Sequence, residues 1–100
     1  MIYKRIGVAD AKRLLENEST VIVDIRDTFS FIYGHVNKAI NLTQANLENF
    51  VKNTDKQQPL LVVCYHGNSS QVAAEYLSQQ GFADVYSLDG GYEAWRTENV

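Results

Sequence analysis

Short β-branched runs alternate with amphipathic stretches along this chain, and the alternation is typical of α/β proteins with a largely parallel sheet. Two of the runs, at 20–24 and 60–63, are almost entirely apolar. Strands that are covered on both faces of a sheet have this composition. We therefore predict five strands, over residues 3–6, 20–24, 38–41, 60–63 and 85–88.

The amphipathic stretches between these runs predict the helices. A helix over 9–17 gathers four apolar residues on one face, namely Val8, Ala11, Leu14 and Leu15. A short helix over 28–33 ends at Gly34. A third helix begins after Thr43, whose hydroxyl is suited to cap its N-terminus. The residues that this third helix turns inward are Leu47, Phe50 and Val51.

The clearest helical pattern covers residues 70–80. Ser69 or Ser70 is suited to cap its start, and Gly81 is suited to end it. Its predicted buried stripe consists of Val72, Ala73, Tyr76 and Leu77. A last short helix is expected over 92–95.

Bulk properties narrow the classes of function. The chain has 100 residues, 45% of them apolar and 21% charged, which suits one globular domain. Lys and Arg are scattered and the net charge is −3, so we expect no nucleic-acid partner. The longest apolar run, 60–65, is too short to span a membrane, and charges spread through the N-terminal segment exclude a secretory signal. Because the single cysteine cannot form an internal disulfide, we expect a cytoplasmic protein.

The segment 60–70 reads Leu-Leu-Val-Val-Cys-Tyr-His-Gly-Asn-Ser-Ser and joins a buried strand, a tight loop and a helix start. Cys64 follows the strand at its carboxyl end, where α/β sheets bind ligands. Gly67 and Asn68 tolerate positive φ, so N–H groups of the loop can converge there, and the helix N-terminus adds more donors. We therefore predict that Cys64 is a nucleophile held as a thiolate. The predicted binding loop is Tyr65, His66, Gly67, Asn68, Ser69 and Ser70.

Anion binding in this loop has to rest on backbone groups, because residues 57–74 contain no Asp, Glu, Lys or Arg. Such a site suits a compact anion, either a persulfide or a bound oxyanion. The alternative is that Cys64 is a buried and inert thiol, as a lone cysteine often is. With two His and one Cys the chain lacks the ligands of a zinc site, so we expect no metal. We expect His66 to face solvent or the mouth of the pocket and Tyr65 to form a pocket wall.

A second polar cluster, Val-Asp-Ile-Arg-Asp, ends the second predicted strand. We expect Asp24 and Arg26 to tie loops together through charge-assisted hydrogen bonds, and Asp27 or Thr28 to cap the next helix. A functional alternative places Arg26 beside a substrate anion, but Arg–carboxylate pairs commonly organise loops, which favours structural support. We expect His35 to be a packed or hydrogen-bonded residue with a supporting role.

Four motifs, in order along the chain, resemble signatures of the rhodanese (thiosulfate sulfurtransferase) family and are most similar to its single-domain bacterial members. They are Val-Asp-Ile-Arg-Asp at 23–27, Gly-His-Val at 34–36 with Ala-Ile-Asn-Leu at 39–42, the cysteine loop at 63–70, and Asp-Gly-Gly-Tyr-Glu-Ala-Trp at 89–95. The resemblance implies that residues 1–100 form a single rhodanese domain. It further implies a central five-stranded parallel sheet of order 1-5-4-2-3, flanked by helices.

The resemblance also implies ping-pong chemistry without a cofactor. Cys64 would take the outer sulfur of thiosulfate, release sulfite, and pass the sulfur to cyanide or to a thiol acceptor, for which thioredoxin is a candidate. Many relatives carry Arg or Lys in the catalytic loop, and this chain has neither, so we expect a high KM for thiosulfate.

Three other functions stay open at this point. One is a dual-specificity phosphatase, which shares the fold but needs a Cys-x5-Arg loop that this chain lacks. Another is an arsenate reductase, to which the same objection applies less severely. The third is a binding module that has kept the fold and lost the activity.

Overall fold

The two nearly all-apolar runs form neighbouring strands of a five-stranded parallel sheet, in a computed structural model that describes residues 2–98. The strand order is β1-β5-β4-β2-β3, as the family resemblance implied. The bounds are Lys4–Ile6 for β1, Val21–Asp24 for β2, Ile40–Asn41 for β3, Leu60–Val63 for β4 and Val85–Leu88 for β5. Every residue of β4 is buried, because this strand is paired on both sides and covered on both faces.

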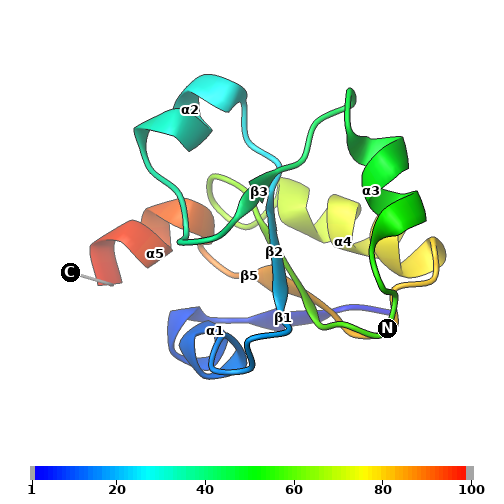
Figure 1. Cartoon of the computed structure of the whole chain (residues 1–100). Helices are drawn as coiled ribbons and strands as arrows, with labels where there is room; N and C mark the ends of the chain where they lie inside the picture. The colour runs from blue at the N-terminus through cyan, green and yellow to red at the C-terminus, as the bar shows by residue number, and fades with distance from the viewer. Residues whose placement is uncertain (1, 99–100) are drawn as a thin grey trace.

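Helices cover both faces of this sheet and make three layers (Figure 1). The bounds are Val8–Leu14 for α1, Thr28–Tyr33 for α2, Leu47–Asn53 for α3, Ser69–Gln79 for α4 and Gly91–Glu98 for α5. Helices α3 and α4 lie over one face, α1 and α5 lie over the other, and α2 lies beyond the carboxyl end of β2. Parallel strands joined by helical crossovers place all their carboxyl ends at one edge, which is where the cysteine loop lies.

Two apolar clusters hold the layers together. The first joins β2, β4 and β5 to α4, and the second joins the opposite face of the sheet to α1 and α5. Val62 and Ala74 belong to the first, while Leu61 and Ala11 belong to the second. Neighbouring residues of β4 thus face opposite layers, as the pleat of a strand requires. Trp95 packs against the second cluster.

The predicted buried stripe of α4 is partly wrong. Val72 is 75% exposed and Tyr76 is 42% exposed, whereas Leu77 is buried as predicted. The fully buried residues of this helix are Ser70, Ala74 and Leu77, which are spaced by four and three and so share one face. The helix lies close to β4 and β5, and this approach admits small residues in place of large apolar ones.

The predicted caps of α3 and α4 are also wrong. Helix α3 begins at Leu47, later than predicted, because the Asn46 side chain accepts a hydrogen bond from the Thr43 N–H at 2.7 Å and closes a turn first. Helix α4 begins at Ser69 after Asn68, and its N-cap has no side-chain hydrogen bond. By contrast, Gly81 follows the end of α4 with a φ of 105°, in the role predicted for it.

Candidate active site

Cys64 follows β4 directly, and its side chain is only 2% exposed. Two main-chain N–H groups donate hydrogen bonds to its sulfur, from Gly67 at 3.1 Å and from Ser70 at 3.2 Å. The hydroxyl oxygen of Ser70 lies 3.2 Å from the same sulfur. Gly67 has a φ of 94°, which a residue with a Cβ rarely adopts, so glycine allows the sharp turn. The sulfur therefore sits among donors that stabilise negative charge on it.

The other side of the loop is fixed by the N-terminus of α5. The N–H of Tyr92 donates to the carbonyl of Cys64 at 2.8 Å, and the N–H of Glu93 donates to the carbonyl of Tyr65 at 3.2 Å. These two bonds fix the backbone at the start of the loop against α5. Gly91 makes the contact possible, since a Cβ there would lie 2.5 Å from the Cys64 carbonyl oxygen. Local sequence patterns did not identify this contact; its signal is the Gly-Gly pair at 90–91.

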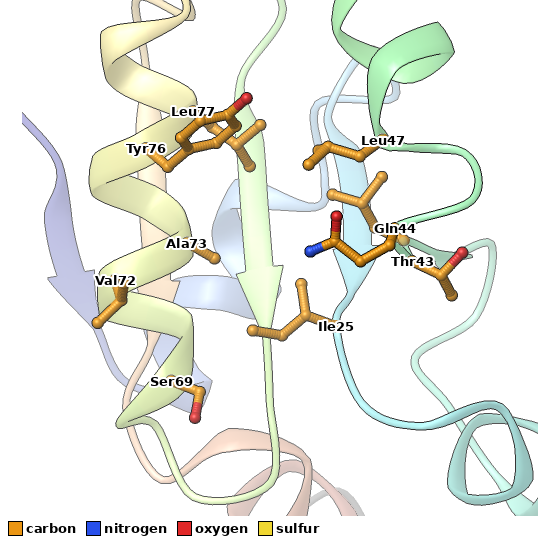
Figure 2. A pocket seen from close by; sticks show the side chains of 10 residues that line it. Ile25, Thr43, Gln44, Leu47, Ser69, Val72, Ala73, Tyr76 and Leu77 are labelled. Atoms are coloured by element: carbon orange, nitrogen blue, oxygen red, sulfur yellow. The ribbon is translucent and has the colours of Figure 1, made fainter.

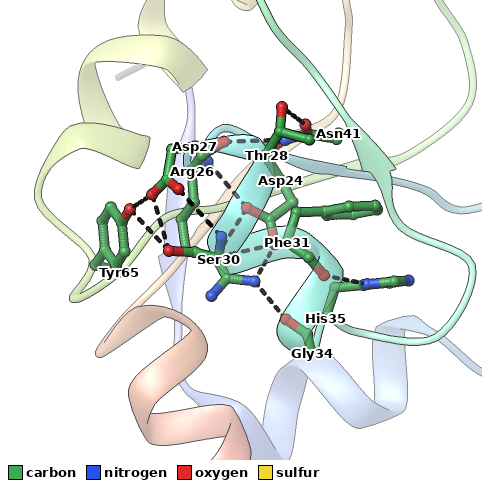
Figure 3. Close-up of polar contacts among 10 residues, drawn as sticks. All are labelled: Asp24, Arg26, Asp27, Thr28, Ser30, Phe31, Gly34, His35, Asn41 and Tyr65. Atoms are coloured by element: carbon green, nitrogen blue, oxygen red, sulfur yellow. Dashed lines mark hydrogen bonds and ion pairs between the residues drawn. The ribbon is translucent and has the colours of Figure 1, made fainter.

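The hydrogen bonds of the sulfur involve Gly67 and Ser70 and none of the other loop residues. Tyr65, His66, Asn68 and Ser69 are exposed. The hydroxyl of Tyr65 bonds to the carboxylate of Asp27 and lies 3.1 Å from the hydroxyl of Ser30, so the ring forms a wall between the loop and α2 (Figure 3). The His66 ring lies beside Tyr65, with 6.4 Å between ring centroids.

Asp27 also caps α2, and its carboxylate is held in the ionised form. It accepts hydrogen bonds from the hydroxyl of Ser30 at 2.8 Å and from the N–H of Ser30 at 3.1 Å. These bonds, the hydroxyl first, lower the pKa of the Asp27 carboxyl below its usual value of 3.8. One carboxylate thus joins the helix start to the wall of the cysteine loop.

The pair Asp24 and Arg26 lies beside the loop and supports it. Arg26 donates from Nη2 to Asp24 at 2.7 Å and to the carbonyl of Gly34 at 2.7 Å (Figure 3). Its guanidinium carbon lies 4.2 Å from the centroid of the Tyr92 ring. Arg26 therefore contacts Asp24, the end of α2 and the start of α5.

His35 lies on the far side of this cluster from Tyr65 (Figure 3). Its Nδ1 is 2.7 Å from the carbonyl oxygen of Phe31, and the two rings are stacked with 3.8 Å between centroids. The imidazole is exposed and belongs to the surface of α2, not to the surroundings of the sulfur.

An apolar groove of about 800 Å³ opens next to the loop, between α4 and the segment that leads into α3 (Figure 2). Val72, Ala73 and Tyr76 line one wall and Leu47 lines the other. Ser69 lies at the end of the groove that is nearest the cysteine loop. The exposed residues of α4, which sequence periodicity assigned to the core, therefore form the lining of a surface groove.

Residues 2–98 contain neither a cluster of metal ligands nor a membrane-spanning helix. In this part of the chain no three His, Cys, Asp or Glu side chains gather as a metal-binding group. The helices described are too short or too polar to cross a membrane.

Comparisons with known proteins show what the chain is similar to. Residues 7–98 match the rhodanese-like domain. A thiosulfate sulfurtransferase GlpE of Shewanella oneidensis is 52% identical over 98 residues, which are 98% of this chain and 97% of the relative. One of Pseudomonas putida is 52% identical over 94 residues, covering 94% of this chain and 86% of the relative. A rhodanese-related protein of Thermoplasma volcanium has a TM-score of 0.80 at 31% identity, covering 96% of this chain and 93% of that one.

Proposed function

The chain belongs to the family of rhodanese-like domains, and from this we propose that it is a thiosulfate sulfurtransferase, made of one domain over residues 1–100, with Cys64 as its catalytic residue. The observation that carries the assignment of Cys64 is the convergence of the Gly67 and Ser70 N–H groups on its sulfur, at 3.1 Å and 3.2 Å. A sulfur held in this way is stabilised as a thiolate, the form that acts as a nucleophile.

The first half-reaction loads sulfur onto the protein. The Cys64 thiolate attacks the outer sulfur of thiosulfate, and the sulfur–sulfur bond of thiosulfate breaks with its electron pair leaving on sulfite. A persulfide anion forms on Cys64. Its terminal sulfur carries the negative charge, which main-chain donors of the loop stabilise without a metal or a basic side chain. Tyr65, His66, Asn68 and Ser69 would line the mouth through which thiosulfate enters.

The second half-reaction unloads that sulfur. Cyanide or a thiolate attacks the terminal sulfur, the persulfide bond breaks, and its electron pair returns to Cys64 as the thiolate. The products are thiocyanate or a persulfide on the acceptor, and the resting enzyme is regenerated. We take the physiological acceptor to be a thiol, for which thioredoxin is a candidate, and the location to be the cytoplasm, where a lone thiol stays reduced.

The loop does not favour phosphoryl transfer. Phosphatases that share this fold clamp the phosphoryl oxygens with an arginine at the position of Ser70. Here the side chain of Ser70 is a buried hydroxyl that faces the sulfur, and residues 65–70 contain no cation other than the titratable His66. The site therefore lacks the charge that would hold a phosphoryl dianion.

Intact-mass spectrometry tests the proposal directly. After incubation with thiosulfate, the wild-type protein should gain one sulfur atom, and cyanide should remove it with release of thiocyanate. Cys64→Ser should keep the fold but gain no sulfur and lose turnover by at least about 1000-fold. Full turnover by Cys64→Ser would end the covalent mechanism, the absence of any sulfur gain would favour a binding module, and phosphate release from an aryl phosphate would favour a phosphatase.

A further inference from the structure

Ser87 is a fully buried hydroxyl in the middle of the sheet, on β5. It pairs in register with Val62 of β4, so the two strands hold its position. Its Oγ lies 2.7 Å from the Oγ of Ser70, which is also fully buried. Since the Ser70 hydroxyl lies 3.2 Å from the Cys64 sulfur, two buried hydroxyls form a line that leads from β5 to the nucleophile.

A buried hydroxyl costs free energy unless its hydrogen bonds are made. A small apolar residue would suit the surroundings of Ser87, whose neighbours Val85 and Leu88 are buried. A hydroxyl has one proton to donate, and its oxygen can accept. If Ser70 donates its proton to an anionic sulfur at Cys64, the Ser70 oxygen is left as an acceptor, and the Ser87 hydroxyl is the buried donor within reach.

We propose that Ser87 is a positioning residue for sulfur transfer, an inference that rests on the proposed function of Cys64. Ser87 donates its hydroxyl proton to the Oγ of Ser70 and so directs the Ser70 proton to the sulfur of Cys64. Without Ser87, no hydroxyl on β5 holds the Ser70 hydroxyl, whose proton is then free to rotate away from the sulfur. The sulfur then keeps its two N–H donors and loses the third.

The first test is the rate at which iodoacetamide alkylates Cys64, measured against pH. In Ser87→Ala the rate near neutral pH should fall about 5- to 10-fold, since a hydrogen bond to a charged group is affected. The fall in rate should become smaller as the pH is raised. The titratable and charged groups on segments packed around the loop are the same in all variants and cancel in the comparison. They are Asp24, Arg26, Asp27, Tyr65, His66, Asp89, Tyr92 and Glu93.

A matched pair separates the hydroxyl from packing. Ser87→Thr and Ser87→Val have nearly the same shape and add the same bulk, but only the threonine keeps the donor. The threonine variant should stay closer to wild type than the valine variant in its alkylation profile. Equal profiles for the two would overturn the proposal, because bulk alone would then explain the effect. Thermal unfolding of both variants shows whether the added methyl group is accommodated.

A double mutant tests whether Ser87 acts through Ser70. In a Ser70→Ala background, Ser87→Ala should change the alkylation rate by less than about 1.5-fold, because the intermediary is gone. An undiminished effect in that background, or a Ser87→Ala profile that superimposes on wild type, would refute the proposal. Alkylation needs only the thiol, so these outcomes are read even if the wild-type protein gains no sulfur from thiosulfate, the result that counts against the proposed function.

Discussion

Arg26 and Asp24 form a salt bridge from which solvent is excluded, with 2.7 Å between Nη2 and Oδ2 and side chains that are 5% and 0% exposed. Two charges leave water in this contact, and their mutual hydrogen bonds, with the bond from Arg26 to the Gly34 carbonyl, offset the loss of hydration. The pair joins the end of β2 to Gly34 at the end of α2, and Tyr92 covers it. The frame around the cysteine loop therefore depends on an ion pair that tolerates little change.

Removing one charge of this pair should destabilise the protein strongly. Asp24→Asn leaves the Arg26 guanidinium buried without a counter-charge, so we expect the free energy of unfolding to fall by about 3–5 kcal/mol in urea titrations. The matched control is the exposed bridge between Arg5 and Asp89, with side chains 55% and 40% exposed. There Arg5→Gln should leave the free energy of unfolding nearly unchanged, because exposed ion pairs are screened by solvent. Equal costs at the two sites would contradict this account.

Adding a methyl group at Gly91, on α5, should distort the backbone of the cysteine loop that packs against it. Its φ is 61°, and a Cβ would lie 2.5 Å from the carbonyl oxygens of both Cys64 and Tyr65. Gly91→Ala should lower the free energy of unfolding by about 2 kcal/mol or more and reduce sulfur loading of the folded fraction. The control is Gly7→Ala, where a Cβ meets no atom within 4 Å and the cost should be about 1 kcal/mol or less. Wild-type loading in Gly91→Ala would show that the loop does not need this contact.

The ionised carboxylate of Asp27 should contribute to stability only above its unfolded pKa. Hydrogen bonds from Ser30 lower the pKa of Asp27 in the folded protein below the usual value of 3.8. The contribution is thus complete above that value, and it is lost as the pH falls through the lower folded pKa. The urea midpoint of the wild-type protein should fall between about pH 6 and pH 3, and the midpoint of Asp27→Asn should fall by less. Ser30→Ala should narrow the drop in the same direction, and identical slopes in all three proteins would refute the assignment.

The corrected face of α4 makes opposite predictions for two apolar residues. Leu77→Ala opens a cavity in the core and should cost about 2–5 kcal/mol in the free energy of unfolding. Val72 is exposed and lines the groove, so Val72→Ala should change the free energy of unfolding by no more than about 0.5 kcal/mol. A large loss of unfolding free energy in Val72→Ala would instead place Val72 in the core, as periodicity predicted.

Residues 65–70 contain no Lys or Arg, so adding a cation to this loop should strengthen the binding of thiosulfate. His66 is exposed beside Tyr65, so His66→Lys should lower the KM for thiosulfate about 2- to 5-fold at low salt and leave kcat nearly unchanged. The gain should fade at high ionic strength, because exposed charges are screened. His66→Ala should reduce turnover only modestly. A collapse of turnover in His66→Ala would instead assign the imidazole a direct role.

Patterns that depend on neighbours in sequence predicted much of this fold. The all-apolar run of β4 predicts a strand that is covered on both faces, and Gly81 predicts the end of α4. Both signals lie within or next to the element that they predict. The buried face of α4 was misjudged because periodicity cannot distinguish a core residue such as Leu77 from a groove residue such as Val72. That difference depends on what the fold leaves beside the helix.

The candidate site also has features that the local sequence predicts and contacts that depend on the fold. The position of Cys64 after a strand, and the converging donors of its loop, could be expected from the segment around it. The contacts of the loop with Gly91 and of Ser70 with Ser87 could not, because they join residues that are distant in sequence. Only the pairing of β4 with β5 brings them together.

The same pairing means that thiol reactivity reports on the completion of folding. Cys64 is synthesised before β5 and α5. These elements supply the Ser87 hydroxyl and the N–H groups that bind the carbonyls of Cys64 and Tyr65. A chain that stops before residue 87 carries the cysteine but lacks the partners that order its surroundings. The rate of alkylation of ribosome-bound chains of increasing length should therefore change at the length at which β5 and α5 are complete.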